Sequence, residues 1–300
     1  MNDPATIGFL LHPGEQASVQ AAVARAQACG FGVWTALDHP EAELEEHAAT
    51  TKLLVTVGGD GTFLYGGRLA APLGIPVLGA NRGRLGFLAE VEIPRLPEAI
   101  SRFATGDFRI QRRSLIDVET VRGGRPSERA LALNEVVVRT RDVALARVRV
   151  DVDSERLGVF DSDGVVVATA SGSTAYAMSA GGPPVDPRLR VLVVVPLAPH
   201  AVTTRPVVLP DAVNVRVILE RGMCAVAVDG VSLCDLVAGG EVTVRPGPDL
   251  EVVRFADSPA FMQRLRQKFR YGVPLRDIAA ADAEADEQRD DARGELHDAS

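Results

Sequence analysis

The segment KLLVTVGGDGTFL, residues 52–64, constrains the fold more than any other stretch of the chain. Its first part is a near-continuous apolar run, which is typical of a strand buried on both faces in a parallel sheet. A glycine-rich loop with one aspartate follows, and the apolar residues after it suggest a short helix. A strand that passes through a tight loop into a helix is half of a βαβ unit, so the sequence predicts an α/β fold.

Strands and helices alternate on either side of this segment. Three further apolar stretches are predicted strands, at residues 6–12, 31–37 and 75–81. The stretches between and after them include three predicted helices, at residues 15–30, 40–49 and 96–107. This order predicts a doubly wound parallel sheet, in which ligands bind at the carboxyl ends of the strands.

The pattern changes after residue 108. Up to about residue 255 we find no convincing long helix, while alternation with a period of two recurs, as in RVRVDVD at residues 147–153. A mostly β, sandwich-like second region is therefore predicted. A final helix is expected at residues 258–270, with Phe261, Leu265 and Phe269 on one stripe.

These patterns predict a domain organisation. Residues 1–108 form an α/β domain that carries GGDGT, residues 109–257 form a β-rich domain, and residues 258–278 cross back to complete the first domain. The last predicted part, residues 279–300, is an acidic and disordered tail. From Asp277 to the C-terminus there are nine acids and two arginines, which leaves the rest of the chain nearly neutral, with 30 basic and 31 acidic residues.

Composition excludes several classes of protein. The three cysteines are odd in number and lack C-x-x-C spacing, so we expect reduced thiols, and the five dispersed histidines do not suggest a zinc site. No run reaches the ~18 uncharged apolar residues of a membrane span, and the N-terminus lacks the features of a signal peptide. We therefore expect a cytoplasmic protein without a membrane or nucleic-acid partner.

The GGDGT loop is a candidate site for phosphate. Gly58, Gly59 and Gly61 can turn consecutive backbone N–H groups toward one point beside the positive N-terminus of a helix. Asp60 among phosphates suggests a residue that binds Mg²⁺ or accepts the proton of an attacking hydroxyl, and both roles belong to phosphotransferases. The structural alternative is a tight turn in which Asp60 or Thr62 caps the helix.

Two further clusters suggest a binding pocket. In DGVVVATASGSTAYAMSAGGPP, residues 163–184, a predicted strand ends in a loop of small hydroxyl residues, and a short helix follows. The loop could hold a phosphate, a ribose or an amide, or could simply be a turn. LNEVVV, residues 133–138, places Asn134 and Glu135 at the start of an apolar strand, where a carboxylate must be paired or bind something. The alternative for this pair is an edge turn capped by Asn134.

In this order, GGDGT, GANRGRLGFL (79–88), LNEVVV and GSTAY resemble the NAD kinase family, whose members phosphorylate the adenosine 2′-hydroxyl of NAD to make NADP. The resemblance runs from about residue 6 to residue 269. GGDGT by itself is shared with lipid and sugar kinases, whereas the combination of N-E and G-S-T-A-Y is specific. The family fold, an α/β domain plus a β-rich domain with a C-terminal crossover, agrees with the pattern described above.

The resemblance also implies roles for individual residues. Asp60 corresponds to the catalytic base, and Asp163 to the residue that contacts the nicotinamide end. The residues implied to bind NAD are Asp60, Gly61, Asn134, Glu135, Asp163, Thr174, Ala175, Tyr176 and Ser179. The residues implied to lie by the phosphates of the donor are Gly58, Gly59, Gly61 and Thr62.

Substrates and partners follow from the same resemblance. It implies NAD as acceptor, ATP or inorganic polyphosphate as donor, and Mg²⁺ or another divalent cation carried by the nucleotide, with no fixed protein ligands. It also implies a homodimer or homotetramer. The alternatives are another GGDGT-type kinase, acting on a lipid or a sugar, and a catalytically silent nucleotide-binding regulator.

Three positions depart from the family pattern. The common T-P-T-G-S-T-A-Y reads TASGSTAY here, which removes a proline. Asp161 stands where many relatives carry a basic residue, which leaves open a phosphate contact or an inter-subunit NAD contact there. Val231 stands where several bacterial relatives carry glutamine. The central groups of the predicted site are unchanged.

Overall fold

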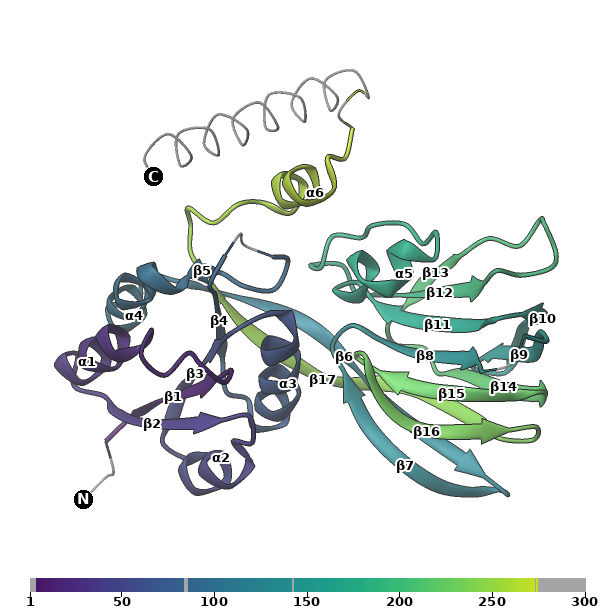
Figure 1. Ribbon diagram of the computed structural model, residues 1–300, viewed down its shortest axis with the longest axis horizontal. Coiled ribbons are helices and arrows are strands. Elements are labelled where there is room, and N and C mark those ends of the chain that lie inside the picture. The colour runs from purple at the N-terminus through teal and green to yellow at the C-terminus, as the bar shows by residue number, and fades with distance from the viewer. Residues whose placement is uncertain (1–3, 84–85, 142, 273, 275–300) are drawn as a thin grey trace, which may run out of the picture. The chain divides into compact units, whose positions relative to one another are not determined.

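The computed structural model describes residues 4–83, 86–141, 143–272 and 274 (Figure 1). The chain divides into two compact units, one that ends at Ser258 and one that begins at Pro259. The first unit contains every strand described below and all of the predicted site residues.

The first unit begins with a parallel sheet in the order β4-β3-β1-β2. The strands of this part are β1 (Thr6–Leu11), β2 (Gly32–Leu37), β3 (Thr51–Val57), β4 (Val77–Asn81) and β5 (Val91–Glu92). The helices are α1 (Gln20–Ala28), α2 (Glu41–His47), α3 (Asp60–Ala70) and α4 (Leu96–Ala104), with 3₁₀ turns at Ala71–Leu73 and Ile93–Arg95. The predicted doubly wound α/β sheet is confirmed.

Helices cover both faces of this sheet, as the apolar run of β3 requires. Leu53, Val55 and Val57 of β3 pack in one cluster with residues of α1 and α4. Leu54, on the opposite face, packs in another cluster with residues of α2 and α3. Alternate residues of a strand point to opposite faces, so a strand buried on both sides must be apolar throughout.

The side chain of Trp34, the single tryptophan of the chain, packs across β1 at Gly8. A Cβ atom on Gly8 would lie 2.1 Å from the Trp34 ring, so glycine leaves the room that the ring occupies. Trp34 Nε1 donates to Thr51 Oγ1 on β3 at 3.0 Å, and the ring stacks on His47 of α2 with 6.1 Å between centroids. These contacts tie β2, β3 and α2 together.

The first helix starts later than predicted. The sequence predicted a helix over residues 15–30, whereas α1 begins at Gln20. The hydroxyl of Ser18 donates to the carbonyl and to the carboxylate of Glu15, both at 2.6 Å. Serine that bonds nearby groups in this way competes with the helical backbone pattern, which explains the delayed start.

The sheet continues from β4 into antiparallel strands, in the order β10-β9-β14-β17-β4 (Figure 1). Strand β17 pairs antiparallel with β6 and β14, and it meets β4 in parallel at Val252 and Val77. The strands of this part are β6 (Arg109–Arg122), β7 (Arg125–Ala132), β9 (Ala146–Val152), β10 (Glu155–Ser162), β14 (Val215–Arg221) and β17 (Glu241–Arg254). The sheet is thus continuous across the boundary predicted between residues 108 and 109.

A second, antiparallel sheet has the order β13-β12-β11-β8-β15-β16. Its strands are β8 (Glu135–Thr140), β11 (Gly164–Thr169), β12 (Val191–Leu197), β13 (Val207–Pro210), β15 (Met223–Val228) and β16 (Val231–Val237). Alternating valines of both sheets, such as Val136 of β8 and Val148 of β9, share one buried cluster. This is a β-sandwich, as the period-two pattern predicted.

Helices are short in the described part of this β-rich region. They are a 3₁₀ turn at Gly172–Thr174 and the single turn α5 (Tyr176–Ser179). The second unit contains α6 (Phe261–Phe269), in which Leu265 is buried and Phe269 is exposed. The return of residues 258–278 onto the first domain stays a prediction, and the acidic tail at 279–300 lies outside the described residues.

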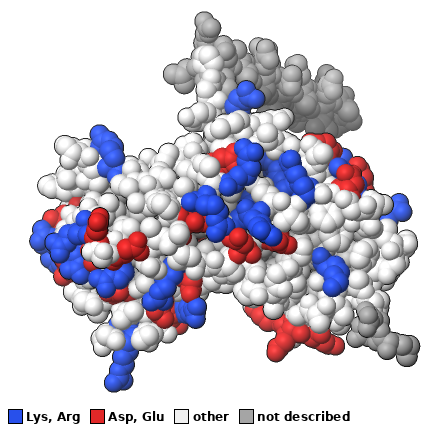
Figure 2. All heavy atoms as spheres, turned by 180° about the vertical axis from the view of Figure 1, so that it is seen from behind, with Lys and Arg blue, Asp and Glu red and all other residues white. Residues whose placement is uncertain are grey.

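Other predictions from composition can be compared with the structure. All three cysteines are free, and Cys224 is the buried one. No helix in the described ranges has the length and apolar character that crossing a membrane requires. On the face seen in Figure 2, basic and acidic side chains are intermixed over much of the surface. Ion pairs such as Arg112 with Glu251, 3.3 Å apart, occur among the described residues.

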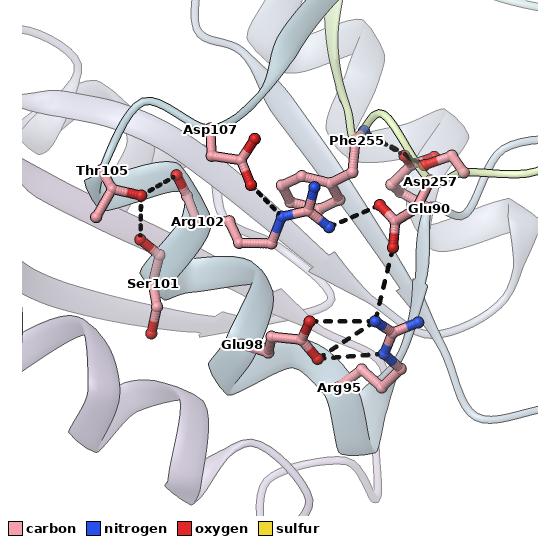
Figure 3. Close-up of polar contacts among 10 residues, drawn as sticks. Glu90, Arg95, Glu98, Ser101, Arg102, Thr105, Asp107, Phe255 and Asp257 are labelled. Carbon is pink, nitrogen blue, oxygen red and sulfur yellow. Dashed lines mark hydrogen bonds and ion pairs between the residues drawn. The ribbon is translucent and has the colours of Figure 1, made fainter.

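A cluster of charges fixes the chain where β17 leaves the sheet (Figure 3). The fully buried side chain of Glu90 accepts hydrogen bonds from the N–H of Phe255 at 2.7 Å and from the hydroxyl of Ser258, and it pairs with Arg254 at 2.9 Å. Beside it, the guanidinium of Arg102 on α4 lies 4.2 Å from the centroid of the Phe255 ring. Arg102 also pairs with Asp107 and Asp257, each at 2.7 Å.

Glu90→Ala should lower the free energy of unfolding by about 3–5 kcal/mol, because it removes the charge that pairs with buried Arg254 and the acceptor of the Phe255 N–H. Urea denaturation followed by circular dichroism measures this. The control is Glu98→Ala, since Glu98 and its partner Arg95 are both more than half exposed, and a change below about 1 kcal/mol is expected there. Equal losses in the two variants would contradict the importance assigned to Glu90.

Candidate active site

The first glycine of GGDGT is required by the backbone. Gly58 follows β3 with φ +155° and donates its N–H to the carbonyl of Ala80 on β4 at 3.0 Å. A Cβ atom there would lie 2.5 Å from Thr62 Oγ1 and 2.9 Å from His12 Cβ. No larger residue fits without moving both neighbours. The loop is therefore held tightly where the strand ends.

The next residues form an open helix N-terminus. Gly59 is the N-cap of α3 and makes no side-chain cap hydrogen bond, so the alternative in which Asp60 or Thr62 is the N-cap is wrong. Gly59 and Gly61 are exposed, and a Cβ atom on either would meet nothing within 4 Å. The first N–H groups of a helix have no partners within it and attract anions, so this terminus can receive a phosphate.

Asp60 lies against a second glycine-containing loop. A Cβ atom on Gly86 would lie 2.9 Å from Asp60 Oδ1, so glycine at 86 leaves the carboxylate its position. Asp60 is partly exposed, whereas Gly86 and the following residues up to Glu90 are buried. The Asp60 carboxylate therefore lies between the glycine-rich start of α3 and the buried residues that begin at Gly86.

Asn134 and Glu135 open the central strand β8. This strand lies between β11 and β15, so the alternative of an edge turn capped by Asn134 is wrong. Asn134 is 9% exposed and Glu135 is 6% exposed. One oxygen of Glu135, Oε2, is buried and has no hydrogen-bond partner among the described residues. An acceptor left open in this way is where the hydroxyl of a ligand can bind.

The surroundings of Glu135 favour its protonated form. Burial, and to a smaller extent the negative charge of Asp229, raise the pKa of Glu135 from 4.5 to about 7, while the N–H of Tyr176 donates to the carboxylate and opposes the rise. A hydrogen-bond donor from a ligand would favour the ionised form in the same way as Tyr176 does.

The G-S-T-A-Y loop packs directly on this strand. A Cβ atom on Gly172 would lie 2.1 Å from the carbonyl oxygen of Asn134, so the two backbones touch. Thr169 donates its N–H to the same carbonyl at 2.8 Å and its hydroxyl to the carbonyl of Leu133 at 2.5 Å. Tyr176 adds the N–H bond to Glu135. The structure thus brings the two predicted clusters of the β-rich region together.

Asp163 lies at the other end of β8. Strands β8 and β11 pair antiparallel, with Ala168 opposite Glu135 and Gly164 opposite Arg139. Asp163 is therefore separated from Glu135 by the length of the strand, five residues or ~17 Å at the usual rise per residue. Tyr176 lies between them, because its N–H donates to Glu135 and its hydroxyl accepts a hydrogen bond from Arg139, on which the charge of Asp163 also acts.

The helix of GGDGT and the N-E pair share one hydrophobic cluster. Phe63 and Leu64 of α3 pack in the same buried group as Leu133, the residue before Asn134. Gly67 of α3 leaves room for Leu250 of β17, since a Cβ atom there would lie 2.9 Å from that side chain. The helix that carries GGDGT and the segment that carries the N-E pair therefore pack in one core.

Comparison with known families identifies this arrangement. Residues 10–108 match the ATP-NAD kinase N-terminal domain, and residues 133–254 match the ATP-NAD kinase C-terminal domain. The chain belongs to the NAD kinase family. The NAD kinase of Heliobacterium modesticaldum is 40% identical over 237 residues, which are 78% of this chain and 83% of the relative. The NAD kinase of Paraburkholderia phytofirmans is 37% identical over 236 residues, 78% and 79% of the two chains.

Two solved structures are similar to the chain. An NAD kinase from Archaeoglobus fulgidus in complex with ATP is 28% identical with a TM-score of 0.67, and the match covers 88% of this chain and 97% of that one. Yeast NADH kinase complexed with NADH is 21% identical with a TM-score of 0.78, covering 91% and 90%. The second likeness shows the fold alone.

The remaining residues that the NAD kinase resemblance singled out have defined positions. Thr174 donates its hydroxyl to the carbonyl of Ser171 at 3.3 Å, and Ala175 precedes α5. Ser179 is exposed at the end of α5. Within the described ranges, no group of three or more His, Cys, Asp and Glu residues could hold a metal ion.

Asp161, one of the departures from the family pattern, lies in an ion-pair cluster. Its carboxylate pairs with Arg147 at 2.7 Å and with Arg221 at 3.0 Å. The hydrogen bond from Arg147 is the main reason that the pKa of Asp161 lies below its ordinary value. The acidic residue at this position is thus matched by two basic neighbours on β9 and β14.

Sequence reasoning missed two residues of the site, Asp229 and Arg68. The carboxylate of Asp229 bonds the backbone at Asn134 and Glu135, and Arg68 of α3 pairs with that carboxylate. In the sequence, Asp229 and Gly230 read only as a hairpin turn. Arg68 reads as a basic residue in the last turn of a helix, where it is common. Nothing in either pattern points to a partner so distant in the chain.

Glu135→Gln should make the stability of the nucleotide-free protein less dependent on pH. Below about 4.5 the carboxyl is protonated in both the folded and the unfolded chain, so it contributes no pH dependence. As the pH rises toward 7, only the unfolded chain ionises freely, and the wild type loses stability. The variant cannot ionise, so its melting temperature relative to wild type should rise between about pH 5 and about pH 8.

Thermal melts of the two proteins at the two pH values measure this effect. Glu128→Gln, at an exposed position, is the matched control and should follow the wild type. The same pH dependence in wild type and Glu135→Gln would contradict the raised pKa.

Proposed function

We propose that this chain is an NAD kinase, which transfers the γ-phosphoryl group of ATP to the 2′-hydroxyl of the adenosine ribose of NAD and gives NADP. The observation that carries the proposal is the 40% identity to a named NAD kinase over most of both chains. The motifs GGDGT, N-E and G-S-T-A-Y are intact, and the last two touch through Gly172 and Asn134.

Asp60 is proposed as the general base. The 2′-oxygen forms a bond to the γ-phosphorus as the bond from that phosphorus to the β–γ bridging oxygen breaks, and ADP leaves. The proton of the hydroxyl passes to the Asp60 carboxylate, which lies at the start of α3 among the glycines. The N–H groups at the start of α3, from Gly59, Gly61 and Thr62, are proposed to face the phosphates, with Gly58 forming the turn before them.

Asn134 and Glu135 are proposed to hold the acceptor. The open oxygen of Glu135 can accept a ribose hydroxyl, which would replace the missing partner of that atom. Tyr176, with Thr174, Ala175 and Ser179, is proposed to line the dinucleotide pocket. Asp163 is proposed to contact the nicotinamide end, in keeping with its place at the far end of β8.

A divalent cation such as Mg²⁺ is proposed to arrive with the nucleotide. The resemblance implies no fixed protein ligands for this cation. Phosphate oxygens would carry the cation, and its charge would offset the negative charge of the transferred group. We also propose inorganic polyphosphate as a second donor to be tested, a homodimer or homotetramer, and a cytoplasmic location.

The direct test is an assay of purified protein with NAD, ATP and Mg²⁺, read through a dehydrogenase that uses only NADP. We expect NADP to form in proportion to enzyme concentration. Parallel reactions with a sphingoid or diacylglycerol lipid and with a sugar phosphate test the other GGDGT-type activities. NADP formation no greater than in the enzyme-free blank, with every donor, would refute the proposal.

Asp60→Asn should lower kcat by about 10²–10⁴, because a positioned general base contributes a factor of that size. The amide keeps the size of the side chain and removes repulsion with phosphates, so NAD binding by calorimetry should change little. Asp107→Asn, at an exposed position after the end of α4, is the control and should keep wild-type kcat. If binding of NAD or ATP falls by the same factor as the rate, Asp60 is a ligand and not a base.

A further inference from the structure

A buried aspartate occupies a hairpin turn where an exposed one would be ordinary. Asp229 and Gly230 connect β15 to β16 with φ of +47° and +80°, the left-handed conformations of a two-residue hairpin turn. Aspartate is common in such turns because it tolerates this conformation. Here, however, its side chain is fully buried, so it is directed into the molecule and not into solvent.

The Asp229 carboxylate accepts hydrogen bonds from the backbone of the N-E segment. Its Oδ1 accepts the N–H groups of Asn134 at 2.8 Å and Glu135 at 3.1 Å, and its Oδ2 accepts that of Leu133 at 3.0 Å. The N–H of Asp229 donates in return to the carbonyl of Glu135 at 3.0 Å. Three consecutive N–H groups are thus held by one side chain at the point where β8 begins.

The same carboxylate binds the helix of GGDGT. Arg68 Nη1 lies 3.3 Å from Asp229 Oδ2, and the Arg68 side chain is 19% exposed. Arg68 lies on α3 eight residues after Asp60, or about 12 Å along a rigid helix. A single carboxylate therefore connects the element that carries the proposed base to the segment that carries the proposed acceptor ligands.

We propose that Asp229 and Arg68 are positioning residues, which hold the acceptor-binding segment Leu133–Glu135 at a fixed distance from Asp60 on α3. The inference rests on the proposed function, because it assigns these residues to the alignment of NAD with the base. Phosphoryl transfer depends on such alignment, and a displacement of about 1 Å can cost about 10² in rate.

Electrostatics gives the proposal a second consequence. Burial raises the pKa of Asp229, while the three N–H groups and Arg68 oppose that rise and favour its charged form. Two groups act on the carboxyl of Glu135, namely Asp229 from the hairpin turn and the N–H of Tyr176 from α5. Removing the charge of Asp229 should therefore lower the pKa of Glu135 toward its ordinary value.

The test uses Arg68→Gln and Asp229→Asn in the full chain. Arg68→Gln leaves the three N–H bonds in place, so we expect a folded protein whose kcat falls about tenfold or more, with a smaller change in KM for NAD. Arg68→Lys, which keeps the charge, should recover part of the rate. Asp229→Asn replaces one acceptor oxygen with an amide donor, so KM for NAD should rise more than KM for ATP.

The pH profile separates positioning from a merely structural role. In Asp229→Asn, the rise of kcat/KM for NAD with pH should shift to lower pH than in wild type, because Glu135 ionises earlier. Arg129→Gln is the control, since Arg129 is largely exposed and also forms an Arg–Asp ion pair, with Asp117 in the β6–β7 hairpin, and it should keep wild-type kinetics.

The outcomes are distinguishable. A wild type that makes no NADP refutes the proposed function, and this inference with it. If the wild type is active and both variants have the kinetics and the pH profile of the wild type, the positioning role of Asp229 and Arg68 is overturned, and the proposed function stands. A fall of kcat that matches only the loss of folded protein, with an unchanged pH profile, also overturns it, because Asp229 and Arg68 would then serve stability and nothing more.

Discussion

The pairing of β17 with strands on both of its sides determines how the rest of this unit is arranged. It pairs antiparallel with β6 and β14, and it meets β4 in parallel at Val252. A slip of one residue would turn every side chain of β17 to the wrong face, so both halves of the sheet are fixed in register. Leu250 of β17 packs in the cluster that contains Phe63 of α3 and Leu133. The helix that carries GGDGT and the residue before the N-E pair therefore pack in one cluster with this strand.

Two buried carboxyls, those of Asp229 and Glu135, lie at the candidate acceptor site and differ in their hydrogen bonding. Asp229 is satisfied by backbone N–H groups and Arg68, whereas Glu135 keeps one oxygen open. An open buried acceptor destabilises the free protein and is satisfied only by a ligand that donates a hydrogen bond. A site built in this way discriminates strongly against a ligand that lacks the hydroxyl, because that ligand would leave the carboxyl unpaired. Specificity would then come from the cost of the wrong ligand as much as from the gain of the right one.

The sequence predicted local patterns well and long-range contacts poorly. The apolar run of β3 and the glycines after it predicted a parallel sheet and a helix start, and both were confirmed. The predicted start of α1 was wrong, because the hydroxyl of Ser18 bonds to Glu15 and the apolar pattern does not show this competing interaction. The alternative that placed Asn134 at an edge turn was wrong, because β8 pairs with β15, whose residues are about 90 positions away in the sequence. Asp229 escaped notice for the same reason, and the roles of the predicted site residues stay predictions.

The single tryptophan, which crosses β1 at Gly8, makes this chain convenient for optical work. Trp34 lies in the core beside α2 and α3, and no tryptophan lies in the β-sandwich. Its fluorescence therefore reports the parallel half of the sheet alone, whereas far-ultraviolet circular dichroism reports the strands of both halves. If the continuous sheet makes the unit cooperative, the two signals should change at the same denaturant concentration. Separate transitions would mean that the β-sandwich and the parallel sheet melt as independent bodies despite the strand they share.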